Sequence, residues 1–296
     1  MKKILLPLIV FVIGWAWRSC HSTAEHHDNT QQTEHRSANA SHRHTTTTPT
    51  SSTTGSEEVD SEPPAEVSPD QFLEIPITPA ATVGEQIVHR GYTTHYNTQW
   101  LIPNWVAYEL TPEETQTSIK REGEFQSDPL VRGNTAIPAD YKRSGYDRGH
   151  MAPAADMKFN RKSMYESFYL SNICPQNHEL NTGLWSVLEK RIRKWAERGE
   201  TIYVVCGPIV KNTDHTIGQN RVVVPQAFFK VLCKKVAGQT YTLGFVFPNE
   251  NCQGNIYNYS MSVDAVEKRT GFDFFSLLPD DVETVAERSS DLRVWQ

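Results

Sequence analysis

The stretch that decides how this chain folds is YDRGHMAPAADM, residues 146–157. An acid, a permanent cation and a titratable imidazole fall within the four residues from Asp147 to His150. Histidine has an ordinary pKa near neutrality, so His150 can take a proton from water, while the planar guanidinium of Arg148 matches phosphate oxygens. Gly149 lets the backbone bend sharply or lie close to a ligand. The stretch indicates phosphate chemistry, against the alternative of a surface turn with scattered polar residues.

Further motifs lie before and after this stretch. In chain order they are WVAY (105–108), FYLSNICPQ (168–176), LNTGLW (180–185), LEK (188–190), CGP (206–208), VP (224–225), FFKV (228–231) and EKRTG (267–271). With residues 147–150 they resemble the DNA/RNA non-specific endonucleases, the ββα-metal or His-Me finger family that includes mitochondrial endonuclease G. The resemblance covers residues 90–281 and is specific because several separate motifs occur in the family's order. It implies an α+β fold with a central, mainly antiparallel sheet flanked by helices.

The N-terminus has the pattern of an export segment. Lys2 and Lys3 precede an apolar run over residues 4–17, the order of charge and hydrophobicity that is typical of secretory signals. This run is short for a membrane span, which needs about 20 residues. Residues 1–20 are therefore expected to be a signal peptide or a membrane or lipoprotein anchor, with Cys20 as the lipidated residue in the last case. We expect the protein outside the cytoplasm, secreted or attached to the cell envelope.

Residues 21–71 are rich in Thr, Ser, His, Glu and Pro and almost lack large apolar side chains. Such a segment cannot bury enough surface to offset its chain entropy, so it is expected to be a disordered linker. It contains six of the eleven histidines, namely His21, His26, His27, His35, His42 and His44. Their irregular spacing favours a solvated spacer over a metal-binding tract.

Residues 72–296 have a globular composition and are long enough for one domain with a hydrophobic core. The whole chain has 29 basic and 35 acidic residues; residues 1–70 contain 5 and 9 of them, which leaves 24 and 26 for the domain. A nearly balanced charge excludes a protein that coats nucleic acid with a general basic surface. Contacts with nucleic acid must come from a local cluster of cations.

Four cysteines lie in the domain: Cys174, Cys206, Cys233 and Cys252. They have no CxxC or Cys/His spacing, so a zinc site is not expected. In an exported protein one or two disulfides are possible, with a pairing that the sequence leaves open.

Hydrophobic periodicity predicts an α+β domain. The predicted strands are residues 86–96, 105–110, 201–210, 222–236 and 241–247, with the last two joined by a turn at Gly238-Gln239. The predicted helices are residues 160–166, 182–198, 262–270 and 281–288. Gly199 is expected to end the longest helix, and Asp280 with Glu283 to cap the last one.

The helix predicted for residues 182–198 has a polar edge. Positions eight residues apart on a helix differ by about 80° and positions four apart by about 40°, so Asn181, Glu189 and Arg193 are expected along one side. At a helix start, Asn181 would also lie where backbone N–H groups favour an anion. The alternatives are an ordinary N-cap for Asn181 and a weak surface ion pair between Glu189 and Arg193.

The resemblance implies a catalytic role for each of these residues. His150 would be the general base that activates water, and Arg148 would stabilise charge on the transition state and bind nucleic acid. Asn181 would be the one direct protein ligand of a hydrated Mg²⁺ ion, for which Mn²⁺ could substitute. Glu189 would hold metal-bound waters, and Arg193 would bind the phosphate.

Three other positions have a smaller expected role. Arg121 is the candidate for a further arginine of the family that binds nucleic acid, although its spacing differs from the family's. Asp147 is expected to hold its loop in place and Asn172 to support the backbone of the site. Some family members have Asn where this chain has Phe168, so no role is carried over there.

The expected function is Mg²⁺-dependent, sugar-non-specific endonuclease activity on DNA and RNA. Two alternatives stay open at this point. One is a non-catalytic nucleic-acid-binding envelope protein on the same fold, and the other is a phosphodiesterase for small nucleotides. The first alternative would be favoured by loss of His150 or Asn181, and both residues are present.

Overall fold

The computed structural model describes residues 72–117 and 119–296, which all lie in one compact unit, Pro64–Gln296. The expected export segment with Cys20 and the linker with its six histidines lie outside the described residues. Within the described part of the chain, no helix has the length and apolar character needed to cross a bilayer.

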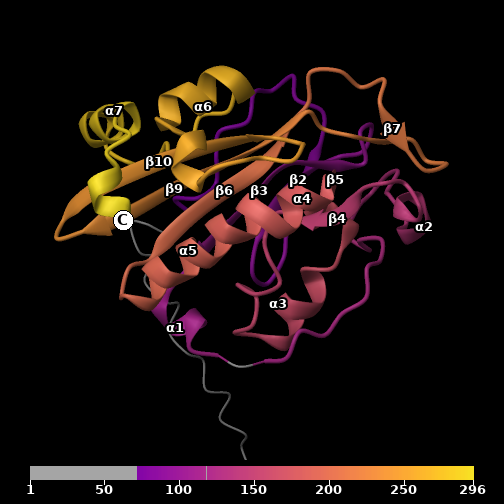
Figure 1. Ribbon diagram of the computed structural model, residues 1–296, viewed down its shortest axis with the longest axis horizontal. Helices are drawn as coiled ribbons and strands as arrows, with labels where there is room; N and C mark the ends of the chain where they lie inside the picture. The colour runs from indigo at the N-terminus through magenta and orange to yellow at the C-terminus, as the bar shows by residue number, and fades with distance from the viewer. Residues whose placement is uncertain (1–71, 118) are drawn as a thin grey trace, which may run out of the picture. The chain divides into compact units, whose positions relative to one another are not determined.

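An antiparallel sheet of seven strands forms the centre of the domain (Figure 1). Its order is β1 (Glu85–Val88), β2 (Thr93–Asn97), β3 (Ile102–Leu110), β6 (Ile202–Ile209), β9 (Ala227–Val236), β10 (Gln239–Pro248) and β11 (Ser260–Met261). Two smaller antiparallel pairs lie outside it: β4 (Asp147–His150) with β5 (Ile173–Gln176), and β7 (Thr216–Ile217) with β8 (Val222–Val223). The predicted α+β class with a mainly antiparallel sheet is confirmed.

Hydrophobic cores cover both faces of this sheet. Successive side chains of a strand point to opposite faces, and on β3 Val106 belongs to one core while Trp105 belongs to the other. Helix α5 (Ser186–Glu197) packs on the first face, and α6 (Val263–Thr270) and α7 (Asp280–Arg288) lie on the opposite side (Figure 1). The remaining helices are α1 (Pro112–Thr115), α2 (Pro138–Tyr141), α3 (Arg161–Glu166) and α4 (His178–Leu180), with short 3₁₀ turns at Leu170–Asn172, Ile256–Tyr259 and Leu292–Trp295.

Local signals account for the helices that the sequence predicted well. The side chain of Asn160 accepts hydrogen bonds from the first turn of α3, and Ser262 caps α6 in the same way. Gly271 ends α6 in the left-handed conformation that glycine adopts without strain. The predicted cap of α7 is wrong, because Pro279 precedes the helix and no side chain caps it.

Two predicted strands are each divided in the structure. Residues 86–96 form β1 and β2, which are separated by a turn that the His89 N–H closes on the Tyr92 carbonyl at 2.8 Å. Residues 222–236 form β8 and β9, because Pro225 has no N–H to continue a ladder. The turn between β9 and β10 lies at Ala237-Gly238, one residue earlier than predicted, and both residues have positive φ.

The disulfides that export would allow are not present in the domain. Cys174, Cys206 and Cys252 are all free thiols, so four cysteines cannot form even one bridge within the domain. Burial raises the pKa of Cys206 to about 11 and raises that of Cys174 well above its usual range. Both thiols therefore stay protonated at neutral pH and behave as small apolar groups.

Candidate active site

The residues of the DRGH motif form β4, which pairs with β5 (Figure 1). Helices α4 and α5 follow β5 in the chain. His150 lies opposite Ile173, and Gly149 lies opposite Cys174. A Cβ atom at Gly149 would overlap the side-chain oxygen of Gln176, so this position requires glycine. The sequence does not predict these two strands, because each is only four residues long and β4 lacks alternating apolar residues.

His150 lies between two aromatic rings. Its ring centroid is 5.3 Å from that of Phe125 and 5.2 Å from that of Phe168. Its Nε2 atom is buried and has no hydrogen-bond partner, while Trp185 donates a 3.3 Å hydrogen bond to its backbone carbonyl. Burial, with a smaller contribution from the positive charge of Arg121, lowers the pKa of His150 to about 3. At neutral pH the ring is therefore uncharged, so one of its two nitrogens is a proton acceptor.

Arg121 lies close enough to affect this imidazole. Its guanidinium carbon is 5.2 Å from the ring centroid of Phe168, the ring that also contacts His150. The structure thus brings Arg121 to the site although the sequence spacing was unusual.

Replacing Arg121 with alanine is expected to raise the pKa of His150, because a nearby positive charge disfavours the protonated ring. The shift should be about one unit or less, since burial is the larger cause. An NMR titration of the His150 ring measures it, with the neighbouring Lys120→Ala variant as the control. An unchanged pKa in Arg121→Ala would show that this arginine does not act on the imidazole.

The side chain of Arg148 is held beside His150 by one backbone carbonyl and two aromatic rings. Its Nη2 donates to the Pro138 carbonyl at 3.0 Å, and its guanidinium carbon lies 5.1 Å from the Phe125 ring and 5.9 Å from the Tyr141 ring. Its Nε is buried without a hydrogen-bond partner. The guanidinium therefore has donors available for an anion next to His150.

Asp147 holds Asn181 in a defined orientation. Asn181 Nδ2 donates to Asp147 Oδ2 at 2.8 Å, and His178 Nδ1 lies 2.9 Å from the same oxygen. An ionised carboxylate only accepts hydrogen bonds, so the NH₂ group of Asn181 must face Asp147. The amide oxygen then faces away from Asp147 and is available to a cation. Asp147 was expected to hold its loop in place, and in the structure it orients the side chain of Asn181.

The predicted position of Asn181 on the long helix is wrong. Residues Asn181–Trp185 form a separate π-helical turn, in which Gly183 has non-helical backbone angles. Helix α5 begins only at Ser186. Asn181 follows α4 with helical angles, so it is neither an N-cap nor a residue at a helix start. Turns of this wide kind occur often at functional sites. This turn and the hydrogen bond to Asp147 place Asn181 at the site. The helical repeat of α5 does not.

Glu189 and Arg193 do share one side of α5, but they do not form the ion pair that was considered. Arg193 Nη1 donates to Asp156 Oδ1 at 2.6 Å, and Tyr108 donates to the other oxygen of Asp156 at 3.0 Å. Asp156 is fully buried, so this pair is far from an ordinary surface contact. It fixes one end of the Arg193 guanidinium, which has further N–H donors.

Lys230 lies at the site although its sequence context did not identify it as a site residue. It lies on β9, is completely buried, and its Nζ is 4.4 Å from the centroid of the Trp185 ring. Its positive charge acts on Asp156 and Glu189. The signal was present in the sequence, because this lysine interrupts the otherwise apolar run FFKVLC.

Burial raises the pKa of Glu189 to about 7; Lys230 opposes this rise and Asp156 adds to it. The ordinary pKa of a glutamate is 4.5. Burial of ionised Glu189 therefore lowers the stability of the folded protein to its full extent above pH 7. It has no such effect below pH 4.5, where the group is protonated in the folded and the unfolded protein. Glu189→Gln is therefore expected to raise Tm by about 5 °C at pH 8 and to leave it unchanged at pH 4.

Thermal unfolding monitored by circular dichroism at the two pH values measures this difference. Glu197→Gln is the matched control, since it removes the same charge from an exposed position on the same helix. An equal effect of Glu189→Gln at both pH values would contradict the raised pKa.

The backbone around the site is supported by Asn172, as expected. Its amide accepts from the Ala152 N–H and donates to the Ala152 and Ser167 carbonyls, each at 2.9 Å. These contacts join the segment after β4 to the segment before β5. Phe168, for which no role was predicted, supplies an edge-on contact to the His150 ring.

The oxygen atoms of the site fit a hard divalent cation. The amide oxygen of Asn181 is turned away from Asp147, and Glu189 adds a carboxylate that is partly ionised near neutral pH. Magnesium prefers oxygen ligands and keeps several of its waters, so a site with few protein ligands suits it.

Comparison with known proteins agrees with this arrangement. The model of the DNA/RNA non-specific endonuclease family matches residues 73–281. The human mitochondrial nuclease EXOG is 34% identical over 225 residues, which are 69% of this chain and 59% of that protein. The nuclease of Serratia marcescens is 34% identical over 209 residues, 67% of this chain and 77% of that protein.

A solved structure supports the same assignment. In a crystal structure of the EndoG/EndoGI complex, one chain superposes with a TM-score of 0.63 and 29% identity, covering 68% of this chain and 89% of that one. The present chain spans about three fifths of the length of the EXOG proteins that it matches. Since the family model covers most of the chain and includes β4, β5 and α5, the chain belongs to the DNA/RNA non-specific endonuclease family.

Proposed function

We propose that this protein is a metal-dependent endonuclease that hydrolyses phosphodiester bonds in both DNA and RNA. The observation that carries this proposal is the buried, uncharged and unpartnered Nε2 of His150 beside the guanidinium of Arg148. A proton acceptor and an anion-binding group next to each other are what hydrolysis of a phosphodiester requires. Family membership supports the same function.

In this proposal His150 Nε2 takes a proton from the attacking water. A pKa of about 3 makes a weak base, but a phosphate anion offsets the positive charge of Arg121 and raises the pKa toward the working pH. Arg148 then donates to the phosphate oxygens as their negative charge increases. The rings of Phe125 and Phe168 hold the imidazole in place and keep bulk water from its faces.

The proposed cofactor is Mg²⁺, for which Mn²⁺ could substitute. Asn181 would hold the ion directly and Glu189 would hold its waters, while Asp147 keeps the Asn181 oxygen turned outward. A bound cation would supply charge stabilisation to the phosphate and the leaving oxygen. Arg193, fixed by Asp156, would bind the phosphate, and the exposed guanidinium of Arg121 would add a contact to nucleic acid.

Incubation of the full chain with circular plasmid, single-stranded DNA and RNA tests this function. We expect all three to be degraded with Mg²⁺ and to stay intact with a chelator. Cleavage of a closed circle establishes internal cutting because a circle has no ends. Binding without cleavage would indicate a non-catalytic module, and hydrolysis limited to small nucleotide esters would indicate a phosphodiesterase.

A further inference from the structure

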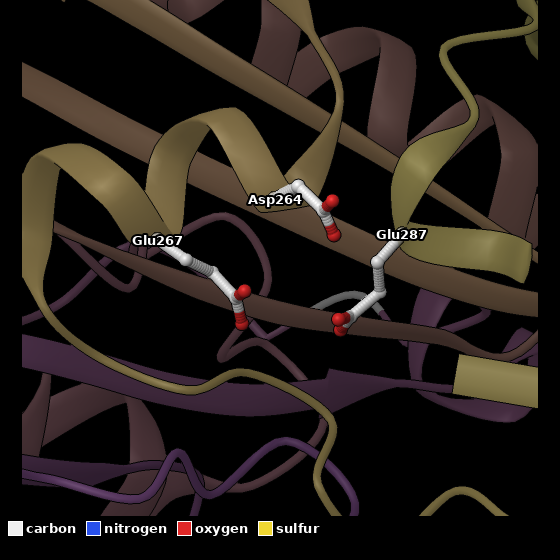
Figure 2. Close-up of side chains that lie close together, drawn as sticks. All are labelled: Asp264, Glu267 and Glu287. Atoms are coloured by element: carbon white, nitrogen blue, oxygen red, sulfur yellow. The ribbon is translucent and has the colours of Figure 1, made fainter. Parts of the chain in front are cut away.

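Three carboxylates meet between α6 and α7, on the face of the sheet opposite to α5. Asp264 and Glu267 lie one turn apart on α6, and Glu287 lies in the last turn of α7. Figure 2 shows the three side chains pointing toward one another, and a carboxylate oxygen from each lies within 4.8 Å of the other two. The proposed nuclease site on β4 and α5 uses none of these residues.

The packing of both helices holds this cluster in place. Gly244 on β10 allows the Val266 side chain to lie against the sheet, because a Cβ there would come within 2.6 Å of it. The Thr242 hydroxyl, also on β10, donates to the Ala286 carbonyl at 2.8 Å and fixes the last turn of α7. The carboxylates therefore face one another from two elements that are attached to the same strand.

Within the described part of the chain, no basic side chain is paired with the three carboxylates. Glu287 is only 3% exposed, and its Oε1 is buried without a hydrogen-bond partner. One backbone group does contribute, since the Phe274 N–H donates to Glu267 Oε1 at 2.9 Å.

The surroundings make this arrangement costly without a cation. Glu287 is buried, and Glu283 and Asp273 add further acidic groups close to it. The C-terminal end of α7 also has a negative dipole end, which adds to the repulsion. A buried carboxylate without a partner is unfavourable, and a bound cation would remove that cost.

We propose that Asp264, Glu267 and Glu287 form a Ca²⁺ site that ties α6 to α7. The cluster has only oxygen ligands, which suit Ca²⁺ or Mg²⁺ and disfavour zinc or copper. Ligands on opposite sides of Ca²⁺ are about 4.6 to 5.2 Å apart and those of Mg²⁺ about 4.0 to 4.2 Å apart. A separation of up to 4.8 Å fits Ca²⁺, with water completing its coordination and a Kd on the order of 10⁻⁴ M.

The test uses the full chain with Asn181→Ala, which removes the proposed catalytic metal ligand. Calorimetric titration with Ca²⁺ should show one bound ion, and about 10 mM Ca²⁺ should raise Tm by about 5 to 10 °C. In the same background, Glu287→Gln should weaken Ca²⁺ binding at least tenfold and abolish the rise in Tm.

Two further variants make the result decisive. Glu283→Gln removes the same charge from α7 without removing a member of the cluster, so its response to Ca²⁺ should stay intact. Asp264→Asn, at a more exposed position, should lose the response even if Glu287→Gln fails to fold. The proposal is overturned if the parent binds no Ca²⁺, if Asp264→Asn keeps full affinity, or if Glu283→Gln loses as much affinity as Glu287→Gln.

Discussion

Replacing His150 with alanine is expected to lower the rate of DNA cleavage by about 10² to 10⁴ while DNA binding stays intact. The substitution removes the proposed proton acceptor but leaves Arg148 and Arg193 to bind phosphate. Because His150 Nε2 has no hydrogen-bond partner, its loss breaks no side-chain hydrogen bond at that atom. Single-turnover cleavage of plasmid and filter binding of the same DNA measure the two effects separately.

The control for this experiment is His215→Ala. His215 is exposed and lies outside the aromatic pocket formed by Phe125 and Phe168, so its loss should leave cleavage unchanged. Imidazole added to the buffer should restore part of the activity of His150→Ala, because a free base can enter the space left by the ring. Turnover of the purified variant near that of the wild type would remove His150 from the mechanism.

The second large effect is expected at Asn181 and its partner Asp147. Asn181→Ala removes the direct ligand of the proposed ion, so we expect cleavage to fall by at least 10² at a fixed Mg²⁺ concentration. Asp147→Asn keeps the ligand but no longer forces its amide oxygen outward. Loss of such an orienting contact raises the metal requirement by about 10- to 100-fold.

Titration of the cleavage rate with Mg²⁺ measures both variants. Glu179→Gln is the control, because it removes a negative charge from an exposed position on α4 without contacting Asn181. Compared with Asn181→Ala, the Asn181→Asp variant is expected to restore little activity. Its carboxylate would face that of Asp147 at the present hydrogen-bonding distance. An unchanged Mg²⁺ requirement in Asn181→Ala would place the ion elsewhere, with Asp147 and Glu189 the oxygen ligands to examine next.

Several features of this protein follow from its sequence alone. The order of the motifs around DRGH was enough to identify the family, and apolar periodicity predicted most strands of the central sheet. Helices α3 and α6 were predicted nearly to the residue because Asn160, Ser262 and Gly271 act on their own neighbours. A cap or a helix stop depends on a few adjacent residues, so its information is local.

The prediction of local structure failed where distant segments decide the conformation. Strand β4 exists because β5, more than twenty residues later, pairs with it, and neither strand has a pattern of its own. The turn at Asn181–Trp185 interrupts what appears as one continuous helical pattern. Hydrogen bonds from Asn181 to Asp147 and from Trp185 to His150 hold that turn against β4.

Only the tertiary structure decided which charged groups are partners. Arg193 pairs with Asp156 across 37 positions of the chain, and Lys230 joins them from a separate strand. The cluster of Asp264, Glu267 and Glu287 likewise requires α6 and α7 to pack on the same strand. The energy of a charge depends on its burial and on neighbours from any part of the chain, and the fold alone sets both.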